Sequence, residues 1–118
     1  MYTDASRNVS RNVSSDMVAV FAALGDPTRA ALLTALAERG SGSATSLAEG
    51  APITRQAVDR HLRVLADAGL VESRRRGREV VYSLEPSTLA RSSEWLEELG
   101  RTWERKLLML KAAAEAEE

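Results

Sequence analysis

Four arginines stand close together around one glycine, in the order Arg74, Arg75, Arg76, Gly77, Arg78. Guanidinium groups stay charged at physiological pH and bind phosphate oxygens in bidentate fashion. Arginines packed side by side repel one another, so a partner that carries many negative charges stabilises the cluster. This stretch therefore predicts contact with a polyanion, and DNA phosphates fit that description.

A second set of polar side chains lies between Thr54 and Ala68, on one side of a helical wheel drawn at 100° per residue. The apolar arc of this wheel holds Ala57, Val58, His61, Leu62, Val64, Leu65 and Ala68. The opposite arc holds Arg55, Gln56, Asp59, Arg60, Arg63 and Asp67. Arginine can donate two hydrogen bonds to guanine and glutamine can pair with adenine, so the polar arc has the chemistry of major-groove recognition.

His61 is the only histidine, and its place within the apolar arc favours a structural or phosphate-side role over base recognition. Glu94, Glu97 and Glu98 form a solvated helix face rather than a metal site. The chain has no cysteine, which excludes disulfides, thiolate zinc sites and cysteine nucleophiles. We therefore predict no metal, no cofactor and no enzymatic activity.

The length and the charge distribution agree with a single DNA-binding domain. The chain has 118 residues and a net charge of −1, so it lacks the uniformly basic surface of a histone-like protein. Residues 54–78 nevertheless carry seven basic and three acidic side chains, and the flanking segments are neutral to acidic. The basic charge is local, which indicates one anion-binding surface.

Hydrophobic spacing and capping residues predict a mainly helical fold in which these side chains are presented. The spacing of Met17, Val20, Phe21 and Leu24 predicts the first helix, with Asp16 as its N-cap and Gly25 as its end. Asp26 and Pro27 start the second helix, which ends near Gly40 and has an apolar stripe of Ala30, Leu33, Leu36 and Ala37. After a loop at residues 41–43, the spacing of Ala44, Leu47 and Ala48 predicts a short helix, which ends at Gly50. Thr54 then caps the helix that bears the polar arc.

Two more elements complete the chain. Leu70 and Val71 begin a strand, and the alternation of Val80, Tyr82 and Leu84 predicts the returning strand of a hairpin with the arginines at its tip. From Pro86 onward, a seven-residue repeat of apolar residues predicts a long helix that pairs with a second copy of the chain. The repeat consists of Leu89, Leu96, Trp103 and Leu110, with Leu99 and Leu107 in the same arc.

The ends of the chain are predicted to lie outside the folded domain. Residues 1–15 contain the tandem sequence Ser-Arg-Asn-Val and form a disordered arm, residues 16–111 form the domain, and residues 112–118 form an acidic tail. The longest apolar run, at residues 17–24, is too short to span a bilayer. We expect a cytoplasmic protein with no membrane contact.

Several ordered motifs together resemble the ArsR-type winged helix-turn-helix repressors. They are LGDPTR at 24–29, TRQAVDRHL at 54–62, AGLV at 68–71 and GREVVY at 77–82. The resemblance implies a homodimer that binds operator DNA, with the first and last helices in the dimer interface. It also implies that Thr54, Arg55, Gln56 and His61 lie on or near the DNA-reading helix and that Arg78 lies at the wing.

Two departures from the family pattern stand out. Ser43 and Thr45 occupy the positions where metal-sensing members have a Cys-x-Cys pair, and the last helix has no histidine. The chain therefore resembles the non-metal, SdpR-like branch, which includes autorepressors. Asp59 stands where the family commonly has serine. Its carboxylate weakens DNA binding unless it pairs with Arg55 or Arg63 or accepts a hydrogen bond from cytosine.

The sequence thus predicts a winged helix-turn-helix fold, mainly α with a small β-hairpin, in a homodimeric, sequence-specific repressor without metal control and with an unknown effector. The alternative is a winged-helix module for protein–protein interaction, which would have a neutral wing and an apolar recognition face. The predicted DNA contacts are Thr54, Arg55, Gln56, Asp59, Arg60, His61, Arg63, Arg74, Arg75, Arg76 and Arg78. The predicted dimer interface is Met17, Val20, Phe21, Leu89, Leu96, Leu99, Trp103, Leu107 and Leu110.

Overall fold

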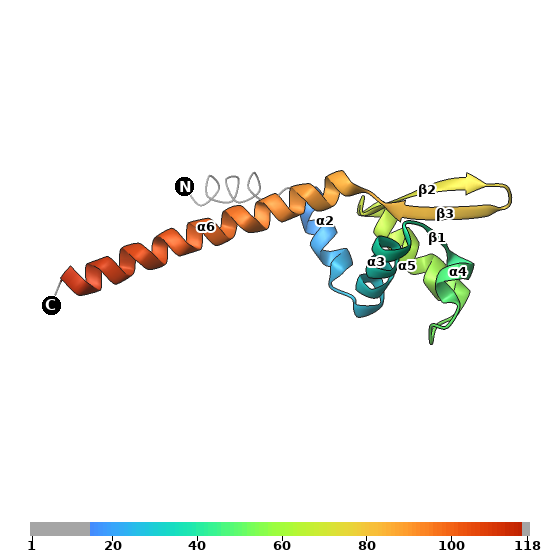
Figure 1. Cartoon of the computed structure of the whole chain (residues 1–118), viewed down its shortest axis with the longest axis horizontal. Coiled ribbons are helices and arrows are strands. Elements are labelled where there is room, and N and C mark those ends of the chain that lie inside the picture. The colour runs from blue at the N-terminus through green and yellow to red at the C-terminus, as the bar shows by residue number, and fades with distance from the viewer. Residues whose placement is uncertain (1–14, 117–118) are drawn as a thin grey trace. The chain divides into compact units, whose positions relative to one another are not determined.

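The computed structural model describes residues 15–116, and it confirms a mainly helical fold with a small antiparallel sheet (Figure 1). The chain divides into one compact unit that ends at Thr88 and a second that begins at Leu89. The predicted N-terminal arm, apart from Ser15, lies outside the described residues. The elements in chain order are α2 (Ser15–Leu24), α3 (Pro27–Arg39), β1 (Gly42–Ser43), α4 (Ala44–Ala48), α5 (Arg55–Asp67), β2 (Val71–Arg76), β3 (Glu79–Leu84) and α6 (Pro86–Ala116).

Helix α3 begins and ends with the caps that its sequence predicts. The Asp26 carboxylate accepts a hydrogen bond from the backbone N–H of Arg29 at 3.0 Å, and Pro27 occupies the first helical position. At the other end Gly40 adopts a φ of +88° and donates its backbone N–H to Leu36, a conformation that glycine adopts without steric cost. Helix α2 begins at Ser15, so Asp16 lies in its first turn and is not the predicted N-cap.

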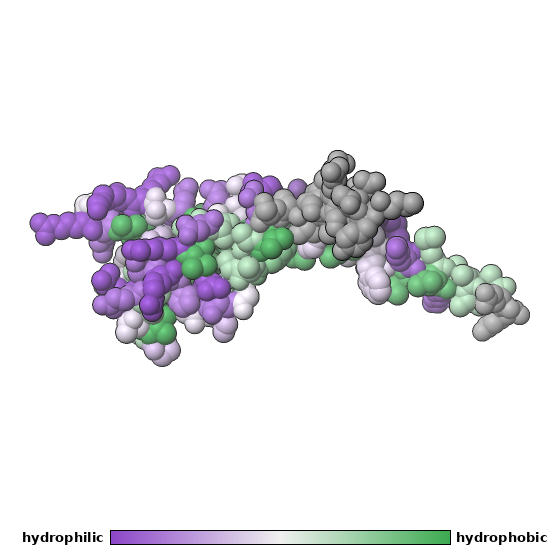
Figure 2. All heavy atoms as spheres, turned by 180° about the vertical axis from the view of Figure 1, so that it is seen from behind, coloured by the Kyte–Doolittle hydropathy of each residue, from purple (hydrophilic) through white to green (hydrophobic). Residues whose placement is uncertain are grey.

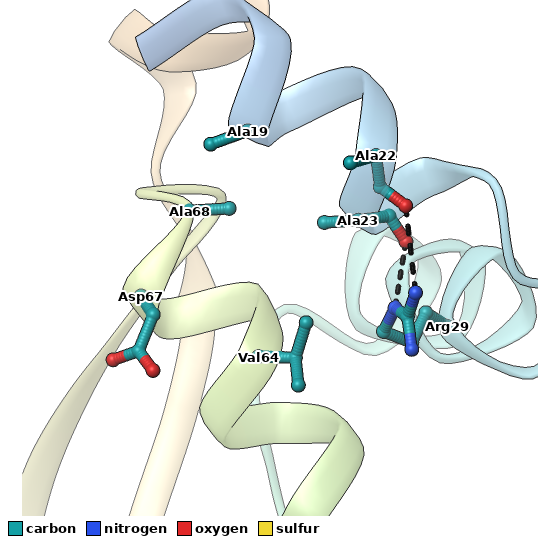
Figure 3. A pocket seen from close by; sticks show the side chains of 7 residues that line it. All are labelled: Ala19, Ala22, Ala23, Arg29, Val64, Asp67 and Ala68. Atoms are coloured by element: carbon teal, nitrogen blue, oxygen red, sulfur yellow. Dashed lines mark hydrogen bonds between the residues drawn. The ribbon is translucent and has the colours of Figure 1, made fainter. Parts of the chain in front are cut away.

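Arg29 joins α3 to the end of α2, a role that the sequence analysis missed. Its Nε donates to the carbonyl of Ala23 at 2.7 Å, and a second guanidinium nitrogen lies 3.4 Å from the carbonyl of Ala22 (Figure 3). These carbonyls belong to the last turn of α2, where the regular helical N–H partners run out; the Ala22 carbonyl also accepts from the backbone N–H of Gly25 at 3.2 Å. Beside this cap is an open hollow of about 330 Å³ lined by Ala19, Ala22, Ala23, Arg29, Val64, Asp67 and Ala68.

The core of the first unit consists mainly of leucine and valine from α3, α4, α5 and the start of β2. Leu36, Val58, Leu62, Leu65 and Leu70 have no exposed surface. The predicted apolar stripes are wrong at two positions, because Ala37 and Val64 are exposed. In α3 the buried face instead includes Leu32, which lies one helical turn before Leu36 on the same side of the helix.

The sheet has the order β1-β3-β2, and β1 was not predicted. Gly42 pairs with Tyr82 and Ser43 with Val81 across about forty residues of chain. Ser43 also caps α4, because its hydroxyl accepts from the N–H of Ser46 at 3.1 Å and the Ser46 hydroxyl accepts in return at 2.9 Å. Residues predicted as a loop therefore both extend the sheet and start the short helix.

Helix α6 runs without interruption from Pro86 to Ala116, through Gly100 and into the segment predicted as an acidic tail. Its predicted stripe is largely exposed: Trp103 keeps 62% of its surface and Leu110 keeps 67%. Leu108 and Met109, which lie off the stripe, are exposed as well. Among the described residues no single helix is long and apolar enough to cross a membrane, whereas α2 and α3, bent by 97°, satisfy that criterion only as a pair.

Candidate nucleic-acid interface

Helices α4 and α5 pack against each other and form a helix-turn-helix within the first unit. The turn between them, at residues 49–54, ends at Thr54, whose hydroxyl accepts from the N–H of Ala57 at 3.1 Å. This bond confirms the predicted cap of α5. Because it satisfies one of the free N–H groups of the first turn, it fixes where the helix begins.

The two sides of α5 differ sharply in burial. Val58, Leu62 and Leu65 are completely buried, so the helix cannot rotate about its axis without losing core packing. The opposite side presents the exposed residues Gln56, Arg60 and Arg63, and Arg55 is exposed in the first turn of the helix. Buried leucines thus hold a row of long hydrogen-bond donors in a fixed orientation, as base recognition in the major groove requires.

Asp59 lies beside this row and is paired with Arg63. The carboxylate oxygen and the guanidinium nitrogen are 2.9 Å apart, and the two residues are one helical turn apart in the sequence. Asp59 keeps 29% of its side-chain surface exposed and Arg63 keeps 72%. The sequence analysis offered Arg55 or Arg63 as the partner of Asp59, and in the structure the partner is Arg63. The positive charge of Arg63 neutralises the carboxylate locally.

The same pair lies close to the sheet. Burial raises the pKa of the Tyr82 hydroxyl in β3, the negative charge of Asp59 raises it further, and Arg63 acts in the opposite direction. These charge effects require Tyr82 to lie near both residues. Tyr82 itself is buried, so it belongs to the core beside this pair and not to the exposed surface.

His61 is half-buried, unlike the exposed residues of this row. The Arg29 backbone N–H holds the pKa of Asp26 below its ordinary value of 3.8, and the charge of His61 contributes to the same direction. His61 must therefore lie near the α3 N-cap. This position favours the structural role over base recognition.

The wing is the hairpin of β2 and β3, which extends beyond helices α3, α4 and α5 (Figure 1). Arg76 pairs with Glu79, and Gly77 and Arg78 form the two-residue turn, with Gly77 at a φ of +63°. The prediction that all four arginines lie at the tip is wrong, because the hairpin register places Arg74, Arg75 and Arg76 within β2. Figure 2 shows hydrophilic residues gathered over this end of the molecule.

The residues predicted for a dimer interface differ in exposure. Val20 keeps only 2% of its surface, so it belongs to the core and has almost no surface to offer a second chain. Met17, Phe21 and Leu89 are half-buried. In α6 the exposed predicted residues are Leu96, Leu99, Trp103, Leu107 and Leu110.

Comparison with known proteins agrees with this architecture. Residues 24–74 match a helix-turn-helix domain family. The chain is 43% identical over 76 residues to the HTH-type transcriptional regulator YuzN of Bacillus subtilis strain 168, covering 58% of this chain and 83% of YuzN. It is 34% identical over 77 residues to the transcriptional repressor SdpR of the same organism, covering 65% of this chain and 84% of SdpR.

A solved structure shows the same fold. The ArsR-like transcriptional regulator from Rhodococcus sp. RHA1 superposes with a TM-score of 0.76 at 42% sequence identity, covering 85% of this chain and 93% of that one. Fold and relatives together define a winged helix-turn-helix, DNA-binding transcriptional regulator. The chain belongs to the ArsR-type family, whose members are transcriptional regulators and not enzymes.

Proposed function

We propose that this chain is a homodimeric, cytoplasmic repressor that binds a specific operator through α5 and the wing. The observation that carries the proposal is the division of α5 into a fully buried side and an exposed side rich in arginine and glutamine. Arg55, Gln56 and Arg60 contact base edges, and Thr54 at the helix start meets a backbone phosphate. Repression is the stated role of its relative SdpR.

The exposed apolar stripe of α6 supports the homodimer. Five large apolar side chains that are each about half exposed or more repeat along this helix, and a second copy of the same stripe covers such a surface by symmetry. Met17 and Phe21 complete the proposed interface. Two copies of α5 then address two half-sites about one helical turn, roughly 34 Å, apart or a multiple of it.

Control by a metal ion is not part of the proposal. Transition metals favour cysteine and histidine as ligands, and the chain has no cysteine and only one histidine. Ser43 and Thr45, at the positions of the metal-sensor cysteines, lie at the start of α4, where Ser43 acts as a helix cap. Hydroxyl groups are poor ligands for such metals.

Fluorescence anisotropy tests the proposal with the DNA upstream of the gene and a scrambled duplex of equal length, over a series of salt concentrations. We expect clear preference for the upstream DNA and a steep decrease of affinity with salt. Weak binding to both duplexes even at low salt contradicts a DNA-binding function and favours a protein partner. Equal, tight binding to both contradicts specific autorepression.

Gln56→Ala tests the proposed recognition face directly. Removal of a bidentate hydrogen-bonded pair relaxes the preference at one base pair by about 1 to 3 kcal/mol. Competition with duplexes that differ at single positions measures this change. An unchanged sequence preference in the variant removes Gln56 from the recognition face.

A further inference from the structure

The four wing arginines lie on different faces of the hairpin. In a strand, successive side chains point to opposite faces, and residues paired across two strands share a face. Val71, Tyr82 and Val80 share the face that carries Arg75, because the register pairs Arg75 with Val80. Val71 and Tyr82 are buried, so we call this the core-side face of the wing.

The outer face holds arginine and glutamate together. Arg74 lies on it with Glu72, and their closest nitrogen and oxygen are 3.8 Å apart. Arg76 lies on it directly opposite Glu79 in the neighbouring strand. Side chains that are directly paired in this way have Cβ atoms about 5 Å apart and interact favourably when their charges are opposite. Each outer arginine therefore has an acidic neighbour.

The core-side face offers its arginine a different environment. Arg75 is opposite the apolar Val80, and no acidic residue lies on its face of the hairpin. Within the described residues 15–116 neither Arg75 nor Arg76 forms an ion pair, so these two arginines differ in whether an acidic residue lies beside them. The side chains of Arg75 and Val80 are both exposed, because the hairpin extends beyond the core. Along the hairpin, the pair of Arg75 and Val80 is the next pair on this face after that of Ser73 and Tyr82. The charges of Asp59 and Arg63 shift the pKa of the Tyr82 hydroxyl in opposite directions. Arg75 is thus the exposed outward continuation of a face whose inner residues, Val71 and Tyr82, pack into the core.

We propose that the core-side face of the wing, through Arg75, and the turn, through Arg78, neutralise DNA phosphates, whereas Arg74 and Arg76 remain on the outer face with their acidic neighbours. The inference rests on the proposed DNA-binding function and specifies which part of the wing performs it. A phosphate binds most favourably to an arginine that has no neighbouring carboxylate competing for its guanidinium group. Arg75 meets this condition on the side where α5 also lies.

The test compares two double variants of the full-length protein, Arg75→Gln/Arg78→Gln and Arg74→Gln/Arg76→Gln. Both remove two positive charges from the same hairpin, so the two variants have the same net charge. For the first pair we expect affinity to decrease on the order of tenfold for each arginine–phosphate interaction removed at 0.15 M salt, equally for upstream and scrambled DNA. The slope of log affinity against log salt should also become shallower by about two.

For the second pair we expect affinity to fall by less than about threefold, with an unchanged slope. An equal fall in both pairs, or a larger one for Arg74 and Arg76, overturns the assignment of faces. Thermal unfolding of each variant verifies the fold, and the single variants Arg75→Gln and Arg74→Gln provide the same comparison if a double variant does not fold. If the wild-type protein itself shows no salt-dependent binding to DNA, the proposed function fails; if it binds and both pairs behave alike, only the face assignment fails.

Discussion

At the scale of single residues, Asp59 shows how a charge that opposes DNA binding is accommodated. A carboxylate on the recognition face repels phosphates, yet here it holds the Arg63 guanidinium at 2.9 Å. Arg63 therefore lies along the helix surface in the free protein. Contact between Arg63 and a phosphate requires this pair to open, which lowers affinity for any DNA sequence.

Replacement of Asp59 by Asn should therefore strengthen binding to scrambled DNA. We expect an increase of about threefold to tenfold and a salt slope steeper by about one, because Arg63 becomes available to a phosphate. The ratio of specific to scrambled affinity decreases accordingly. Anisotropy titrations with both duplexes measure these quantities.

Asp67→Asn is the matched control, since it removes the same charge from the same side of α5 at its other end. It should change both affinities by less than Asp59→Asn does. If Asp59→Asn instead weakens binding to the specific duplex alone, Asp59 accepts a hydrogen bond from a base and does not restrain Arg63.

At the scale of the elements, Arg29 determines how α2 joins α3. Its guanidinium donates to the Ala23 carbonyl and, at longer distance, to the Ala22 carbonyl at the C-terminal end of α2, where a positive charge also interacts favourably with the helix dipole. The backbone N–H of the same residue is held by the Asp26 carboxylate. One residue therefore takes part in the end of one helix and the start of the next.

Arg29→Ala should lower the free energy of unfolding by about 2 kcal/mol, because it leaves the carbonyl of the buried Ala23 without its partner. Urea unfolding followed by circular dichroism measures the change. Arg60→Ala, an exposed arginine on α5, should cost less than about 0.5 kcal/mol. Equal costs for the two variants would show that the hydrogen bonds of Arg29 with α2 add nothing to stability.

At the scale of the whole molecule, the exposed side chains of α6 determine the expected assembly. Figure 2 shows hydrophobic residues along the C-terminal part of this helix. Monomeric proteins rarely leave such a continuous apolar surface in water. A dimer that covers it also doubles the number of recognition helices, so assembly and operator affinity are expected to be coupled.

Trp103→Glu places a charge in the middle of the stripe and should weaken the dimer by at least about 2 kcal/mol, or roughly thirtyfold. Sedimentation at micromolar concentration should then detect monomers, and binding to the upstream DNA should disappear. Met109→Glu adds the same charge to α6 away from the stripe, where Met109 is 71% exposed. A Trp103→Glu protein that stays dimeric would place the interface elsewhere.

The amino-acid sequence by itself determined the helices and the caps of α3 and α5, because both depend on groups within one or two turns of each other; the N-cap predicted for α2 was wrong. Asp26 and Thr54 accept hydrogen bonds from residues three positions ahead, and that spacing can be seen in the sequence. The hairpin followed from alternation around Gly77. The capping role of Arg29 was missed, since its side chain crosses a helix junction.

Only the tertiary structure decided which face each side chain occupies. The pairing of β1 with β3 joins residues about forty positions apart, and no local pattern encodes it. The separation of Arg75 from Arg74 and Arg76 depends on the strand register, which shifts every side chain to the other face if it moves by one residue. The burial of Val20 likewise depends on which elements pack over α2, so an apolar residue predicted for an interface became part of the core.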